Sequence, residues 1–136
     1  MVFAGAPHLG HGEGILAVVH AQLSPRVLIG CGAGGVVGGG REIEEGNGAV
    51  VWALSAPEAT IDPLALTTAS VEGGIALAGL PEDPASYGDA MVVLADPNTF
   101  SADALLLHLN DERPAMPVLG GLASAAPSIA GWPVLC

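Results

Sequence analysis

The chain contains no lysine and only three arginines, against 14 acidic residues, so its formal net charge is −11. A surface of that sign repels phosphate backbones and anionic lipid, and we therefore expect neither nucleic acid nor a membrane as a partner. A P-loop is excluded as well, because that phosphate site needs a lysine beside the phosphates. Kinase or ATPase chemistry has no support in this sequence.

Cysteine is scarce and long apolar runs are missing. Cys31 and Cys136 cannot build a disulfide framework, so we expect two free thiols. The apolar stretches are cut by glycine and proline, and none approaches the roughly 18 residues of a membrane span. The chain opens at Met1 without the basic start and long apolar stretch of a secretory signal. We therefore expect a cytoplasmic protein.

The apolar patterns predict strands alternating with helices, which indicates a mixed α/β fold with a layered sheet and flanking helices. We expect strands at residues 1–6, 26–29, 49–54 and 90–95, with a weaker one within 59–70. Helices are expected at 15–23 and, capped by Ser101, from residue 102 to about 112. Residues 120–123 are expected to be a loop, and residues 72–88 a loop with room for one turn. Gly46-Asn47-Gly48 has the composition of a tight hairpin turn before residues 49–54.

Three segments, in this order and spacing, carry a family resemblance. They are VFAGAPHLGH, then VLIGCGAGGVVGGGREIEEGNGAVVWAL, then VVLADPNTFSADALLLHLN followed by PVLGGLAS. Together they reach from Val2 to about Ser124 and resemble the FIST N-terminal domain, a family of sensory modules in signalling proteins. The resemblance implies sensing of a small molecule such as an amino acid, and a companion C-terminal FIST domain. We accordingly expect residues 1–136 to be one FIST N-terminal-type domain, truncated at its C-terminal end.

The resemblance supplies no catalytic residues, so the candidate ligand site rests on the residues themselves. Loops that follow strands are expected at Gly30–Gly35, Asp96–Thr99 and Gly120–Ala123, and we expect them to converge at one edge of the sheet. The ligand-binding candidates are Gly30, Cys31, Gly32, Asp96, Asn98, Thr99, Gly120 and Gly121. An equally simple role for Asp96 is a turn with Pro97 and Asn98. No cofactor is expected.

Other functions stay open at this stage. Cys31 on a glycine-rich loop is a candidate nucleophile for an enzyme, or a small buried cysteine. His8 and His11 are candidate zinc ligands, or loop histidines that bond locally. Gly30, Gly32 and Gly35 form GxGxxG, although a dinucleotide site needs a helix to begin inside that motif. A scaffold for a C-terminal partner domain is a further alternative.

Overall fold

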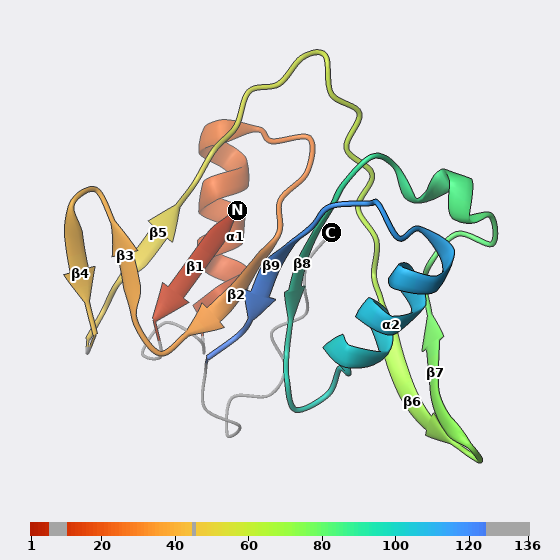
Figure 1. Ribbon diagram of the computed structural model, residues 1–136. Coiled ribbons are helices and arrows are strands. Elements are labelled where there is room, and N and C mark those ends of the chain that lie inside the picture. Colours follow the sequence, from red (N-terminus) through yellow and green to blue (C-terminus); the bar gives the residue numbers. More distant parts are fainter. Residues whose placement is uncertain (6–10, 45, 125–136) are drawn as a thin grey trace. The chain divides into compact units, whose positions relative to one another are not determined.

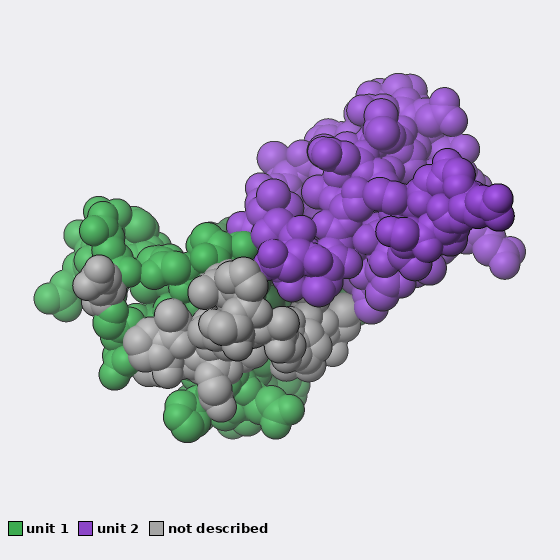
Figure 2. Space-filling model, turned by 90° about the horizontal axis from the view of Figure 1, so that it is seen from below, with its two compact units in different colours: residues 1–63, 123–136 green, residues 64–122 purple. Residues whose placement is uncertain are grey.

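The computed structural model describes residues 1–5, 11–44 and 46–124, and these form two compact units, coloured separately in Figure 2. Unit 1 comprises residues 1–63 together with Ala123 and Ser124, and unit 2 comprises residues 64–122. Each unit combines an α-helix with several strands, so the predicted mixed α/β class is confirmed (Figure 1). In the described part of the chain, the helices do not have the length and hydrophobicity of a membrane span.

Unit 1 is built around a three-stranded sheet in the order β2-β1-β5. Strand β1 (Val2–Gly5) pairs in parallel with β2 (Gly30–Ala33) and antiparallel with β5 (Ala49–Val51). Helix α1 (Gly12–Leu23) connects β1 to β2, as a parallel pair requires. Its Leu16 and Val19 pack against Val2, which is fully buried, so the core of this unit lies between α1 and the central strand.

The glycine-rich tract of unit 1 contains more strand than the sequence predicts. Residues Gly30–Ala33 are strand β2 rather than a loop, and a Cβ atom on Gly30 would collide with the carbonyl of Val2 on the neighbouring strand. The predicted strand at 26–29 is therefore misplaced, because the strand lies directly after it, at Gly30–Ala33. The physical reason is that β2 approaches β1 so closely that only glycine fits at its start.

The hairpin predicted across Gly46-Asn47-Gly48 is also wrong. Strand β4 (Arg41–Ile43) pairs with β3 (Val36–Gly38), and β5 pairs with β1 instead. The two-residue turn of the real hairpin is Gly39-Gly40, with φ of 58° and 74°. Positive φ at both central positions is the requirement of the type I′ turn, which matches the twist of paired strands.

Unit 2 contains a parallel strand pair, one helix and an antiparallel hairpin. Strand β8 (Met91–Ala95) pairs in parallel with β9 (Val118–Leu122), and α2 (Ala102–Glu112) connects them. Strands β6 (Thr67–Val71) and β7 (Gly74–Ala78) form the hairpin, and a 3-10 turn, η2 (Pro84–Tyr87), follows it. The buried core residues are Tyr87, Met91, Leu105 and Leu109.

Two loops expected in unit 2 are wrong. Residues 72–88 contain the unexpected strand β7, although η2 fits the turn allowed there, and Gly120-Gly121 lie inside β9. Gly120 has φ of 146°, and a Cβ atom there would collide with the carbonyl of Val93 on β8. Glycine therefore allows β8 and β9 to pair closely. From composition alone, such a strand at residues 120–123 cannot be told from a loop.

Candidate functional site

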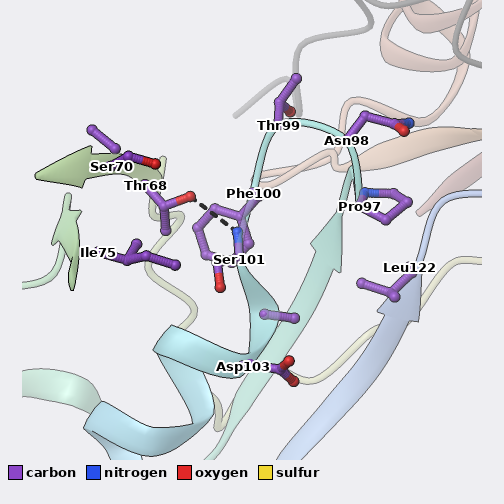
Figure 3. A pocket seen from close by; sticks show the side chains of 12 residues that line it. Thr68, Ser70, Ile75, Pro97, Asn98, Thr99, Phe100, Ser101, Asp103 and Leu122 are labelled. Carbon is purple, nitrogen blue, oxygen red and sulfur yellow. Dashed lines mark hydrogen bonds between the residues drawn. The ribbon is translucent and has the colours of Figure 1, made fainter.

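A cavity of about 440 Å³ lies within unit 2, between the β6–β7 hairpin and the start of α2. In Figure 3 the side chains of Thr68, Ser70 and Ile75 from the hairpin lie on one side of it. Phe100 and Ser101, which lead into α2, lie beside Thr68 in this view. The lining is completed by Ala69, Pro97, Asn98, Thr99, Ala102, Asp103 and Leu122.

The cavity lies beyond the carboxyl ends of the parallel strands. The segment that follows β8 supplies Asn98 and Thr99, and Leu122 is the last residue of β9. Parallel strands end at the same edge of a sheet, and ligands of open α/β sheets bind in the crevice outside those ends. The topology of unit 2 therefore places this cavity where a small ligand is expected.

The start of α2 is held in place by two hydroxyl groups. Ser101 is the N-cap, and its Oγ accepts a hydrogen bond from the backbone N–H of Ala104 at 3.3 Å. The backbone N–H of Ser101 donates to Oγ1 of Thr68 on β6 at 3.0 Å (Figure 3). The first N–H groups of a helix have no acceptor within the helix, so this end carries partial positive charge. Asp103, in the first turn, is an exposed carboxylate beside it.

Asp96 organises the loop between β8 and α2. Its Oδ1 accepts from the backbone N–H and from Nδ2 of Asn98, both at 2.9 Å, and its Oδ2 accepts from the hydroxyl of Thr99 at 3.1 Å. The backbone hydrogen bond from Asn98 lowers the pKa of this carboxyl most; desolvation opposes the shift, and the two side-chain bonds add to it. Asp96 is thus an ionised residue that forms the predicted turn with Asn98.

The predicted site residues are distributed over both units. Asn98 and Thr99 line the cavity, and Asp96 shapes their loop without lining it. Gly120 and Gly121 lie in β9, immediately before the lining residue Leu122. The remaining candidates are in strand β2 of unit 1: Gly30, Cys31 and Gly32.

Sequence reasoning missed the hairpin side of the cavity. Thr68, Ser70 and Ile75 come from strands that were expected as one weak strand and a loop. Ser101 was predicted as the cap of a helix and Asp103 falls within that predicted helix, but neither was assigned to a site. A strand end followed at once by a capped helix was the available signal for them.

Cys31 is a half-buried thiol on β2. Burial raises its pKa, which reduces the thiolate fraction at neutral pH, whereas reactive cysteines have a lowered pKa. The glycine motif that begins beside it is followed by strand β3 rather than by a helix. A dinucleotide site needs a helix N-terminus at that point, so the motif lacks its essential element.

The histidine pair of the first loop is described only in part. His8 lies outside the described residues, and His11 is the exposed N-cap of α1, where its side chain makes no capping hydrogen bond. Within residues 1–5, 11–44 and 46–124, no group of three or more His, Cys, Asp or Glu residues lies together to hold a metal ion.

Comparison with known proteins supports the resemblance. The FIST N domain family matches residues 1–130. Uncharacterized protein Rv0628c of Mycobacterium tuberculosis (strain ATCC 25618 / H37Rv) is 33% identical over 117 residues, which are 86% of this chain and 30% of that protein. Uncharacterized protein Mb0898c of Mycobacterium bovis (strain ATCC BAA-935 / AF2122/97) is 31% identical over 117 residues, again 86% of this chain and 30% of that protein.

The chain therefore spans about a third of the length of the curated relatives it matches. No solved structure matches it. Since the family match covers residues 1–130, almost the whole chain, the protein belongs to the FIST N domain family, a family of sensory domains in signal transduction.

Proposed function

We propose that unit 2 binds a small ligand, an amino acid or a metabolite of similar size, in the cavity between the β6–β7 hairpin and the start of α2. The observation that carries the proposal is the position of a cavity of about 440 Å³ beyond the carboxyl ends of the parallel strands β8 and β9. Ligand pockets generally have volumes of roughly 300–1,000 Å³. Binding without turnover is the activity expected of a sensory domain.

The chemistry of the lining suits a small zwitterion. The N-terminal end of α2 offers partial positive charge and N–H groups to a carboxylate. The carboxylate of Asp103 and the hydroxyl of Ser70 offer acceptors to an ammonium group. Ile75 and Phe100 supply apolar surface for a side chain. An amino acid combines these three features in one molecule.

The wider role follows from the family. We propose that the protein acts in the cytoplasm and that a companion C-terminal FIST domain is the partner that receives the signal. An enzyme with Cys31 as nucleophile is not proposed, because burial raises the pKa of that thiol. The cavity in unit 2 is the feature that favours sensing over a scaffold.

Thermal unfolding in the presence of individual amino acids tests the proposal. A ligand that binds only the folded protein stabilises it by mass action, by about 2.7 kcal/mol at a concentration 100 times its Kd. Nucleotides and zinc serve as comparison compounds in the same buffer. We expect a rise in Tm that grows with the concentration of one or a few amino acids.

A substitution that fills the cavity identifies the site. Ser70 is exposed on the hairpin and lines the cavity, so Ser70→Tyr should block the ligand without disturbing the core. Ser55→Tyr, on an exposed segment of unit 1, introduces the same side chain elsewhere. The ligand-dependent rise in Tm should disappear in Ser70→Tyr and persist in Ser55→Tyr. Its persistence in both variants would refute the cavity as the site.

A further inference from the structure

Gly46-Asn47-Gly48 has the composition of a hairpin turn but connects β4 to β5, which do not pair with each other. The side chain of Asn47 is exposed, and the residue after it has no side chain. We infer that Asn47 is a site of spontaneous deamidation, at which this one asparagine is converted to aspartate and isoaspartate. Asparagine is among the thermolabile residues of proteins.

The reaction needs only the protein and water. The backbone nitrogen of Gly48 attacks Cγ of Asn47, a nitrogen–carbon bond forms, and the attacking nitrogen loses its proton. The side-chain nitrogen leaves as ammonia, and a five-membered succinimide remains. Water then adds to either of its two carbonyl groups. Opening at one gives aspartate, and opening at the other gives isoaspartate, in which the backbone runs through the former side chain.

The attacking nitrogen belongs to a glycine whose carbonyl is hydrogen-bonded to β1. The N–H of Gly48 has no hydrogen-bond acceptor among the residues that the structure describes, whereas its carbonyl accepts from the N–H of Gly5 at 2.8 Å. Gly48 has no Cβ atom of its own to hinder attack on the amide of Asn47. Gly46, on the other side, has φ of 119°, a conformation open to glycine.

The two other asparagines of the chain lack this combination. Nδ2 of Asn98 is held by Asp96 at 2.9 Å, and the residue that follows Asn98 is β-branched. Asn110 lies inside α2, where the next backbone N–H is engaged in the helical ladder. Both should therefore stay intact while Asn47 reacts, and they provide internal controls within the same molecule.

The product would change the backbone directly before β5. Isoaspartate lengthens the backbone directly before the first pair of β5 with β1, Ala49 with Ala4. The change acts on Gly48, which is buried and packs against Val36 and Ile43. It also adds a negative charge to a chain whose formal charge is already −11. We therefore expect the modified protein to unfold at a lower temperature than the intact one.

Peptide mapping of the folded protein after incubation in mildly alkaline buffer tests the inference. The expected result is loss of the unmodified Asn47 peptide, its replacement by aspartate and isoaspartate forms, and methylation of the isoaspartate form by a protein isoaspartyl methyltransferase. Asn98 and Asn110 should remain intact, and Asn47→Gln should abolish the conversion. The same chain in concentrated urea provides the unfolded reference.

Two results would overturn the inference. Conversion of Asn47 in urea but not in the folded protein would show that the fold locks the segment. Conversion of Asn98 or Asn110 at the rate of Asn47 in the folded protein would show that the site has no special reactivity.

Discussion

The backbone N–H of Ser101 donates a hydrogen bond to the hydroxyl oxygen of Thr68 at 3.0 Å, across 33 positions of the chain. The bond connects the β6–β7 hairpin to the N-cap residue of α2, and both residues line the cavity of unit 2. It positions the hairpin side of the cavity relative to the helix side. The shape of the proposed site therefore depends on a hydrogen bond between two of the residues that line it.

Replacing Thr68 by valine tests that contact. Valine keeps the shape and the β-branch but offers no acceptor, so the partly buried N–H of Ser101 would lose its partner. We expect the free energy of unfolding to fall by about 1–3 kcal/mol in urea denaturation. Thr67→Val is the matched control, because Thr67 is the exposed neighbour on the same strand. Equal stability of the two variants would contradict a structural role for the bond.

The cap of α2 is tested separately. Ser101→Ala removes the Oγ that accepts from the N–H of Ala104 but keeps the N–H that binds Thr68. We expect a loss of about 1 kcal/mol in the free energy of unfolding. Ser101→Asp retains a capping oxygen and should restore most of it. If alanine and aspartate at this position behave alike, the side chain is not acting as a cap.

The loop after β8 should weaken in acid. The pKa of Asp96 in the folded protein lies below its ordinary value of 3.8, so its carboxylate contributes fully above that pH. The contribution is lost as the pH falls below 3.8 and through the folded pKa. Asp96→Asn resembles the protonated form, so the stability difference between the two proteins should shrink over this range. A stability difference that stays constant, or grows, as the solution is acidified would show that the pKa of Asp96 is not lowered in the folded protein.

Adjacent glycines of β9 should differ sharply in their tolerance of alanine. Gly120 has φ of 146°, and an added Cβ atom would collide with the carbonyl of Val93. At Gly121 the same atom would meet nothing within 4 Å. Gly120→Ala should therefore cost more than about 1 kcal/mol in thermal unfolding, and Gly121→Ala should change stability by about 0.5 kcal/mol or less. Similar Tm values for the two variants would contradict the pairing of β8 with β9.

Elements with a clear local signal were predicted from the sequence. The strand at 90–95 and the helix from 102 to 112 match β8 and α2 closely, because an apolar run and a capped, periodic stripe each carry their own information. The capping role of Ser101 was predicted and is confirmed by its bond to Ala104. Helix α1 was predicted too, although it begins at Gly12, before the predicted start.

The errors share one physical cause. Gly30 and Gly120 are glycines because a neighbouring strand comes too close for a Cβ atom, and local composition cannot reveal a neighbour distant in sequence. Gly39-Gly40 and Gly46-Asn47-Gly48 are equally good turn sequences, and only the pairing of β5 with β1 decides which one closes a hairpin. The hairpin side of the cavity was missed for the same reason, since β7 is recognisable only beside β6.

The most direct test of the central claim is an NMR titration of the folded protein with the amino acid that raises its Tm most. Saturable shifts in the backbone amide signals of Thr68, Ser70, Ser101, Ala102 and Asp103 would support binding in the cavity of unit 2. Shifts confined to β2, at Gly30, Cys31 and Gly32, would place the ligand in unit 1 and contradict the account.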